Sequence, residues 1–512
     1  MEDVYWADKI ANKILEKNKD VYVIASGITP SGTIHIGNFR EEMTVEIVRR
    51  ALLDKGVKVR YVHSWDDFDR FRKVPANVPK KWEEYIGMPV SKVPDPWGCH
   101  KSYGEHFEKE FEEAAKIVGV QPEYVYEHKE YGACKYKDGI KEALNKREKI
   151  MEILNRFRKE PLPSDWYPVQ IYCTKCGKDF TKVISYDGGY KIKYKCKCGN
   201  EEEIDFSKQG VVKLRWRVDW AMRWRYYNVD FEPGGKEHST LGGSRDTSSI
   251  ISKEIFNYEP PIYQMYDFVI LKGKGGKMSG SKGNVIALKD LNEIYLPEIV
   301  RYFYAGTRPN TEFAIPMDDE IFKVYEDFYF TERVYFGKEE VDEKKKKHLK
   351  RVYEMSMIKM PKELPIEMPF KYLVFLSQIY RDDDKVIKKL KQTGHLKETL
   401  NEFDDKRIKM LINMARNWAD KYADEKYKFQ IHEEKHFELS DKEKQAIKML
   451  IEKIDGLTEN MLYEIGKESG LGKEFFKVCY KILLNKERGP RLFELIENIG
   501  REKVKEILEK YL

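Results

Sequence analysis

A short apolar strand followed by a glycine-rich turn constrains the fold of this chain more than any other feature. The run Val21–Ala25 is apolar and rich in β-branched residues, as expected of a buried parallel strand. It is followed by residues 26–38, SGITPSGTIHIGN, and then by apolar residues at helical spacing. The glycines let the backbone bend and approach a ligand closely. We therefore predict a strand–turn–helix unit whose helix N-terminus suits phosphate.

His35 in this turn could donate a hydrogen bond to an oxygen that gains charge during a reaction. The alternative is an ordinary turn whose histidine caps the helix or packs, because short motifs recur by chance. A second segment favours the functional interpretation. Residues 272–284 read KGKGGKMSGSKGN, a glycine-rich loop with four lysines and two serines. Such a loop can close over a polyphosphate, although a solvated basic loop is the plainer alternative.

In this order the two segments resemble the signature motifs of class I aminoacyl-tRNA synthetases, usually written HIGH and KMSKS. The surrounding words, TPSGTIHIGNFRE and GGKMSGSKGN, look most like the class I lysyl-tRNA synthetases found mainly in archaea. Asn38 replaces the second histidine of the first motif, and Gly280 replaces the second lysine of the other. Both variants fit the lysine branch, and the resemblance runs over most of the chain.

The resemblance implies an enzyme that joins L-lysine to tRNA(Lys), using ATP and Mg²⁺. Lysyl-adenylate would form first, and the lysyl group would then pass to the 2′-hydroxyl of the terminal adenosine. Catalysis would depend on His35, Asn38, Lys277, Ser279 and Ser281. The residues implied to bind ATP are Pro30, His35, Gly37, Asn38, Lys277 and Met278. Those implied to bind the amino acid are Gly27, Thr29, Glu41, Trp220 and His238.

The lysine ε-ammonium needs an anionic partner if it enters a partly buried pocket. Glu41, one turn into the predicted helix, is the favoured partner, and Asp67 or Asp69 is the reserve.

Three other functions stay open. A class I synthetase for glutamate or arginine would share both motifs. A small HxGH nucleotidyltransferase would share the first motif, but it lacks a cysteine-rich insertion and a long helical C-terminus. A non-catalytic tRNA-binding paralogue would keep the fold, although both motifs look chemically intact here.

A second strand over 57–63 completes a strand–helix–strand unit, which predicts a parallel, doubly wound sheet. Asp66, Asp67 and Asp69 follow this strand at the end where ligands bind, although they could equally cap a helix. Helices are expected over 6–17, 107–118 and 140–157, and the last core strand over 262–271. We predict an α/β Rossmann-type fold with a zinc-bearing insertion, followed by an all-α C-terminal region.

The length of 512 residues allows three or four domains. We expect the catalytic domain in two halves, 1–72 and 213–290, separated by an inserted region over 73–212. By resemblance, 291–360 is a connector that contacts the tRNA stem, and 361–512 is an α-helical anticodon-binding domain. Within 214–225, arginines alternate with aromatic residues, which could stack RNA bases or form the edge of a core.

Four clustered cysteines, Cys173, Cys176, Cys196 and Cys198, predict a structural zinc ribbon or knuckle. The second pair is C-x-C, tighter than the usual C-x₂-C. A second zinc site is possible at Asp95, Cys99, His100 and His106. Its spacing matches no standard zinc finger, and a thiol beside surface histidines is the equal alternative.

The remaining bulk properties exclude several classes. The net charge of +6 among 35% charged residues does not by itself indicate nucleic-acid binding. The N-terminus lacks the basic and apolar regions of a signal peptide, and no apolar run approaches about 20 residues. We expect a cytoplasmic monomer without membrane association.

Overall fold

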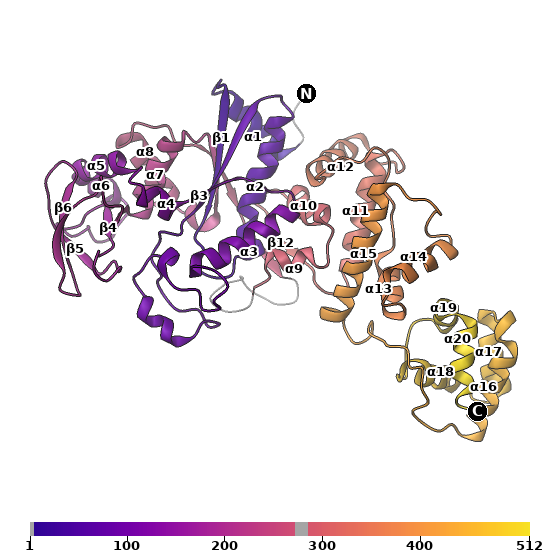
Figure 1. The fold of residues 1–512 in the computed structure, drawn as a ribbon. Helices are drawn as coiled ribbons and strands as arrows, with labels where there is room; N and C mark the ends of the chain where they lie inside the picture. Colours follow the sequence, from indigo (N-terminus) through magenta and orange to yellow (C-terminus); the bar gives the residue numbers. More distant parts are fainter. Residues whose placement is uncertain (1–4, 272–284) are drawn as a thin grey trace. The chain divides into compact units, whose positions relative to one another are not determined.

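The computed structural model describes residues 5–271 and 285–512, whose contacts divide the chain into two compact units (Figure 1). The first unit comprises Met1–Asn292, Pro297–Ile315 and Gly337–Met360. The second comprises Glu293–Leu296, Pro316–Phe336 and Pro361–Leu512. Within the described residues, all strands belong to the first unit, and the second is built from helices.

A five-stranded sheet forms the centre of the first unit, in the order β10-β9-β1-β2-β3. Its strands are β1 (Val21–Ile28), β2 (Lys58–Trp65), β3 (Glu123–Tyr126), β9 (Phe231–Gly235) and β10 (Ile262–Tyr266). All neighbouring pairs are parallel. The chain runs outward from β1 to β3 on one side, whereas β9 and β10 lie on the other. The predicted doubly wound α/β class is therefore confirmed, with its switch point between β1 and β9.

Helix α2 (Ile36–Leu53) begins where the sequence predicts and follows β1 through the glycine-rich turn. Its buried face includes Phe39, Met43 and Ile47, and α1 (Trp6–Leu15) packs nearby. The other helices of the first unit are α3 (Tyr103–Ile117), α4 (Glu127–Gly132), α5 (Lys137–Asn145), α6 (Arg147–Asn155), α7 (Trp216–Tyr227), α8 (Ser244–Glu254), α9 (Leu288–Asn292), α10 (Pro297–Gly306) and α12 (Glu343–Ser356).

Three small sheets complete the first unit. Strands β4 (Val169–Ile171) and β8 (Val212–Leu214) pair antiparallel. Strands β5 (Thr181–Tyr186), β6 (Lys191–Cys196) and β7 (Glu201–Asp205) form an antiparallel ribbon. Strands β11 (Val269–Leu271) and β12 (Phe313–Ile315) pair in parallel. Short 3₁₀ turns cover Lys80–Tyr85, Val90–Lys92 and Lys236–His238.

Three elements differ in extent from the sequence-based expectation. The helix expected over 140–157 is two helices, because the backbone of Lys146 leaves the helical region at φ −101° and ψ 21°. The strand expected over 262–271 is also two, β10 and β11. Between them Asp267 folds its carboxylate onto the Phe268 N–H, at 2.9 Å, and β11 joins a different sheet. Strand β3 belongs to the central sheet although it lies within residues 73–212.

The second unit contains α11 (Ile321–Tyr335), α13 (Phe370–Ile379), α14 (Asp383–Gln392) and α15 (Glu402–Lys421). Glu332 of α11 and Arg407 of α15 form a buried bidentate ion pair at 2.6 and 2.8 Å. The remaining helices are α16 (Asp441–Lys453), α17 (Glu459–Glu468), α18 (Glu474–Leu484), α19 (Leu492–Ile499) and α20 (Arg501–Glu509), with a 3₁₀ turn at Ile454–Gly456. They share an apolar core that includes Leu450, Ile482 and Leu495. The all-α C-terminal region is confirmed.

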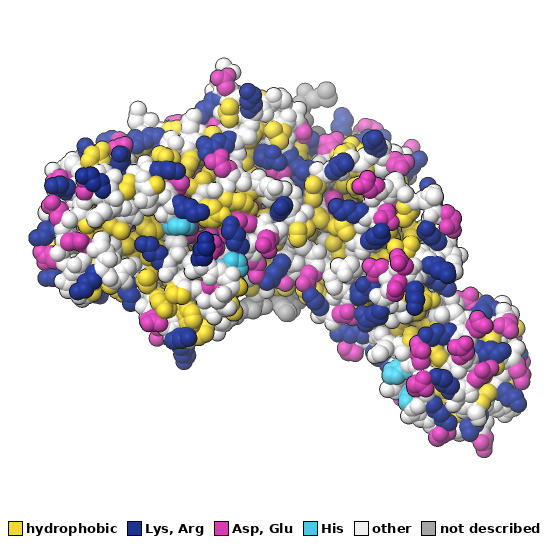
Figure 2. Space-filling view, in the orientation of Figure 1, with side chains coloured by type: hydrophobic (Ala, Val, Ile, Leu, Met, Phe, Trp, Pro, Cys, Tyr) yellow, Lys and Arg dark blue, Asp and Glu magenta, His cyan; other side chains and the backbone are white. Residues whose placement is uncertain are grey.

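Basic and acidic side chains are interspersed on the face drawn in Figure 2. This pattern agrees with the near balance of charges in the sequence. In the described part of the chain, no helix is both long and apolar enough to cross a membrane.

Candidate active site

A cavity of about 460 Å³ lies at the carboxyl ends of β1, β2 and β9, next to the switch point of the sheet. All five residues that the sequence implied for amino-acid binding line it: Gly27, Thr29, Glu41, Trp220 and His238. A second cavity of about 380 Å³ is lined by His35, and both cavities share Asn38 and Thr29. Two of the residues expected at the ATP site, His35 and Asn38, therefore lie beside those expected to bind the amino acid.

The other implied residues fall into two groups. Of the described residues, Pro30 and Gly37 line neither cavity. Lys277, Met278, Ser279 and Ser281 lie outside the described residues.

The start of α2 fixes the orientation of the His35 ring. Its Nδ1 accepts the Gly37 N–H at 3.1 Å, and the Asn38 side-chain oxygen accepts the His35 N–H at 3.2 Å. Because Nδ1 accepts, the ring proton of neutral His35 resides on Nε2, which can donate to a ligand. A Cβ on Gly37 would lie only 2.9 Å from the ring, so this fold-back needs glycine.

Residues on both sides of the segment 272–284 contact the start of α2. After the segment, the Ile286 carbonyl accepts the Ile36 N–H at 3.0 Å, and Ala287 pairs with His35 as an isolated β-bridge. Before it, the Val269 carbonyl lies 3.9 Å from the position of a Cβ on Gly37. Described residues on both sides of the predicted lysine-rich loop therefore lie close to the start of α2.

Glu41 is half-buried and lies between two donors at the edge of the larger cavity. Its Oε1 accepts the Gly27 N–H at 2.8 Å, and its Oε2 accepts the Tyr266 hydroxyl at 2.6 Å. Burial raises the pKa of the Glu41 carboxyl to about 8, although both hydrogen bonds oppose the shift.

Three tryptophans of α7 and one carboxyl of β9 also line this cavity. The rings of Trp216 and Trp220 stack with centroids 5.1 Å apart, and Trp220 and Trp224 lie 4.9 Å apart. Glu232 accepts the indole N–H of Trp220 at 3.0 Å and that of Trp224 at 2.5 Å. The ring of His238 lies 6.0 Å from that of Trp220. Burial raises the pKa of Glu232.

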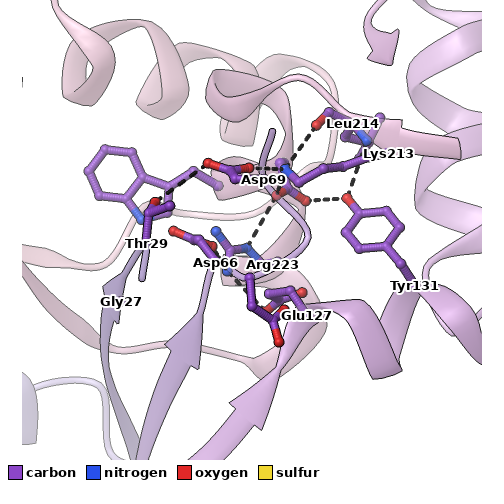
Figure 3. Close-up of polar contacts among 12 residues, drawn as sticks. Gly27, Thr29, Asp66, Asp69, Glu127, Tyr131, Lys213, Leu214 and Arg223 are labelled. Carbon is purple, nitrogen blue, oxygen red and sulfur yellow. Dashed lines mark hydrogen bonds and ion pairs between the residues drawn. The ribbon is translucent and has the colours of Figure 1, made fainter. Parts of the chain in front are cut away.

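A largely buried ion cluster borders the cavity (Figure 3). Arg223 contacts Asp66 at 2.9 Å and Glu127 at 3.0 Å, whereas Lys213 contacts Asp69 at 3.0 Å. Both basic side chains also pair with Asp219, at 3.7 and 3.0 Å respectively. Burial raises the pKa of Asp66 to about 6 and that of Glu127 to about 7, although Arg223 opposes both shifts.

The reserve carboxylates suggested by the sequence already have basic partners. Asp69 pairs with Lys213, and its Oδ2 lies 3.5 Å from the Thr29 hydroxyl. Asp67 accepts hydrogen bonds from the backbone and the ring of His128. Glu232, Arg223 and Lys213 were not identified from the sequence. The only sequence signal for Glu232 was an acid at the end of a strand.

The four clustered cysteines have a geometry that fits zinc. The sulfurs of Cys173 and Cys198 are 3.7 Å apart, and those of Cys176 and Cys196 are 3.6 Å apart. A tetrahedral ion with Zn–S bonds of about 2.3 Å requires sulfur separations of about 3.8 Å. All four ligand atoms lie within 4.8 Å of one another.

The second group has a comparable geometry. The Cys99 sulfur lies 3.2 Å from Nδ1 of both His100 and His106, and 3.3 Å from an Asp95 oxygen. Its four ligand atoms also lie within 4.8 Å of one another. One carboxylate, one thiol and two imidazoles are a donor set that suits zinc.

Comparison with known proteins identifies the family of this chain. A family model described as tRNA synthetases class I (K) matches residues 4–359. A lysine–tRNA ligase of Pyrococcus horikoshii is 45% identical, covering 97% of this chain and 98% of that protein. One from Borrelia garinii subsp. bavariensis is 43% identical and covers 100% of both chains. A solved glutamate–tRNA ligase of Elizabethkingia meningosepticum aligns over 96% of this chain and 99% of its own, with 13% identity and a TM-score of 0.45. The chain therefore belongs to the class I tRNA synthetases, and within them to the (K) family.

Proposed function

We propose that the chain joins L-lysine to tRNA(Lys) at the expense of ATP, in the two adjoining cavities. The assignment of lysine as the amino acid is supported by similarity to lysine–tRNA ligases over the full length of the chain. The gathering of Gly27, Thr29, Glu41, Trp220 and His238 around one cavity supports the choice of site.

In the first step, a lysine carboxylate oxygen attacks the α-phosphorus of ATP, and the bond to the β-phosphate breaks. Pyrophosphate leaves, and lysyl-adenylate remains. In the second step, the terminal 2′-hydroxyl of the tRNA attacks the activated carbonyl carbon, loses its proton and releases AMP. Neither step needs a protein nucleophile, because the protein contributes positioning and charge neutralisation. Mg²⁺ bound to ATP would neutralise part of the phosphate charge.

The start of α2 binds the phosphates in this proposal. His35 donates from Nε2, and Asn38 donates from its side-chain amide, toward oxygens that gain charge as the bond to pyrophosphate breaks. Gly37 allows the histidine to fold back, and Pro30 shapes the turn around the nucleotide. The helix N-terminus adds a positive end to the local field.

Lys277, Met278, Ser279 and Ser281 complete the ATP site in this proposal. Lys277 neutralises the β- and γ-phosphates, Met278 contacts the nucleotide, and the two serines shape the loop. Support comes from the sequence motif and from the contacts of Val269, Ile286 and Ala287 with the start of α2. Those contacts involve described residues that precede and follow the segment in the chain.

Gly27, Thr29, Glu41, Trp220 and His238 bind the amino acid in this proposal. Glu41 binds an ammonium group of the lysine substrate, and Trp220 packs against the methylene groups of that lysine. Gly27 lines the cavity, and glycine suits this position because a Cβ there would lie 3.3 Å from the Ser64 carbonyl oxygen and 3.9 Å from Asp66 Oδ2.

We further propose two structural zinc ions. Cys173, Cys176, Cys196 and Cys198 would hold one, and Asp95, Cys99, His100 and His106 the other. Each group supplies four ligands and leaves no position open for a reactant, so the ions would stabilise the fold rather than take part in the reaction.

The domain roles expected from the sequence remain part of the proposal. Residues 1–72 and 213–290 form the catalytic domain, and 73–212 form the inserted region. Residues 291–360 contact the tRNA stem, and the helices of 361–512 bind the anticodon. The protein works as a cytoplasmic monomer.

ATP–pyrophosphate exchange with each of the twenty amino acids, with and without tRNA, tests the function. We expect exchange with lysine alone, followed by charging of tRNA(Lys). Exchange with glutamate or arginine instead of lysine would show that the chain is a class I synthetase for that amino acid. Binding of tRNA without exchange would favour a non-catalytic paralogue.

A further inference from the structure

A cavity outside the proposed active site lies among α1, α10 and α12 of the first unit (Figure 1). Its volume is about 470 Å³, similar to the 460 Å³ of the amino-acid cavity. It shares no lining residue with either cavity of the proposed active site. The lining includes Trp6 of α1, Arg308 after α10, and Asp342, Lys344 and His348 around the start of α12. We call it the α1/α12 cavity.

Polar contacts join the elements that form its walls. The Tyr5 hydroxyl, next to Trp6 in the chain, donates to the Ala305 carbonyl of α10 at 2.9 Å, and both residues are buried. Arg351 of α12 pairs with Asp8 of α1 at 2.7 Å. The walls are therefore held together by contacts within the protein, without a ligand.

The basic side chains of the α1/α12 cavity outnumber its acids. Arg308 and Lys344 are exposed, and neither has a carboxylate partner in the part of the chain that the structure describes. Asp342 is the one acidic residue among the described lining residues, and its Oδ1 accepts the Lys345 N–H at 2.9 Å as the cap of α12. Burial and the nearby Arg308 lower the pKa of His348. Uncompensated positive charge in a concave site attracts an anion.

Trp6 indicates which kind of anion fits. Its indole is half-buried and forms an aromatic wall beside the basic groups. A guanidinium and an ammonium suit the oxygens of a phosphate, whereas an indole face suits a nucleobase or the apolar side of a ribose. A nucleotide carries both parts in one ligand, and a cavity of this volume can hold it.

We propose that the α1/α12 cavity binds a nucleotide through its phosphate, with Arg308 and Lys344 neutralising the phosphate and Trp6 packing against the base or ribose. The nucleotide is either free or one unit of a bound RNA, because both present the same phosphate and rings. This site goes beyond the proposed function, in which ATP reacts next to His35.

Equilibrium dialysis with radiolabelled AMP tests the free nucleotide. Lysyl-sulfamoyl-adenosine, a stable analogue of lysyl-adenylate, first fills the proposed active site, so that AMP reaches only other sites. We expect one AMP per wild-type chain. Arg308→Ala and Lys344→Ala should each weaken AMP binding about tenfold or more, since each removes a charged donor to the phosphate.

Filter binding of a tRNA(Lys) transcript at several salt concentrations tests the RNA unit. If the cavity receives an RNA phosphate, Arg308→Ala and Lys344→Ala should each weaken binding. Each should also lower the slope of log affinity against log salt concentration by about one. Trp6→Ala should weaken binding without changing this slope, because the indole carries no charge.

Lys347→Ala is the matched control, because Lys347 is an exposed lysine of the same helix that does not line the cavity. It should leave AMP binding and the salt slope of tRNA binding unchanged. A loss specific to Arg308→Ala and Lys344→Ala in either measurement supports the proposal and identifies the source of the nucleotide. If both variants match Lys347→Ala in both measurements, the proposal is overturned.

Failure of the proposed function gives a different result. If the wild-type protein binds neither the adenylate analogue nor tRNA(Lys), the assigned reaction is wrong. AMP binding is then compared among wild type, Arg308→Ala, Lys344→Ala and Lys347→Ala without the analogue, because the α1/α12 cavity does not depend on the active site. Equal AMP binding by all four proteins would overturn the α1/α12 site as well.

Discussion

His35 combines a fixed ring with a donor nitrogen that faces away from its own backbone. Nδ1 accepts the Gly37 N–H, so the neutral ring carries its proton on Nε2. A donor held in place before the reaction stabilises developing charge without reorganisation. We expect His35→Ala to lower the rate of lysyl-adenylate formation about 10²-fold or more, measured in a single turnover. His35→Gln, which keeps a donor, should retain more activity. A loss of only a few-fold in the alanine variant would reduce His35 to a packing role.

The raised pKa of Glu41 predicts that lysine binding is linked to protons. Burial places this pKa near 8, so the carboxyl of the free protein is mostly protonated at pH 7. The groups that face it are the Gly27 N–H, Tyr266, Glu232 and Asp66. A bound ammonium favours the ionised carboxylate, so lysine binding should release a proton, and lysine affinity should fall as the pH drops below about 8.

Titration calorimetry in two buffers of different ionisation enthalpy measures this proton release. Glu41→Gln should reduce the released fraction, because glutamine has no proton to lose in this range. Equal binding enthalpies in both buffers at pH 7 would contradict the linkage.

The antiparallel ribbon β5–β6–β7 depends on more than its own apolar contacts. Cys173 and Cys176 precede it, Cys196 is the last residue of β6 and Cys198 follows, so one ion would tie both ends of the hairpin together. We expect about two zinc ions per chain by elemental analysis. Cys176→Ser and Cys99→Ser should each remove one ion. Cys134→Ser, which changes a thiol outside both groups, should remove none.

Among these elements, the features that could be predicted from the sequence are those whose interacting residues lie close together in the chain. The strand–turn–helix unit was predictable because its glycines, its histidine and its apolar spacing are local. The cysteine pairs were predictable because the ligand spacing is itself the signal. The break at Lys146 was not, because a single backbone rotation leaves the apolar pattern on both sides intact.

The hydrogen bonds that hold the Glu232 carboxyl could not be predicted from the sequence. They come from two indole N–H groups of α7, which only the folded chain brings to β9. The ion cluster similarly joins Asp66, Glu127, Lys213 and Arg223 from four separate segments. Charge pairing of this kind arises only when the sheet is assembled.

At the scale of the whole molecule, the two units carry separate apolar cores. The core of α16–α20 includes Leu495, which is fully buried in α19. Leu495→Ala should destabilise this core by about 2–5 kcal/mol through the cavity it leaves. Leu512→Ala is the matched control, because Leu512 is 51% exposed.

Differential scanning calorimetry measures the effect. We expect more than one unfolding transition, and ATP with lysine should raise the transition of the first unit. Leu495→Ala should lower a transition that these ligands do not raise. A single transition shifted by both the ligands and the substitution would show instead that the two cores unfold together.

The tryptophan wall has a practical consequence. Trp216, Trp220 and Trp224 line the larger cavity, and the chain has nine tryptophans in all. A third of its indole fluorophores therefore border the amino-acid cavity, and two of them are hydrogen-bonded to Glu232. Lysine bound in this cavity, as proposed, would change the electric field across those rings, so ultraviolet emission from the unlabelled protein would report occupancy of the cavity.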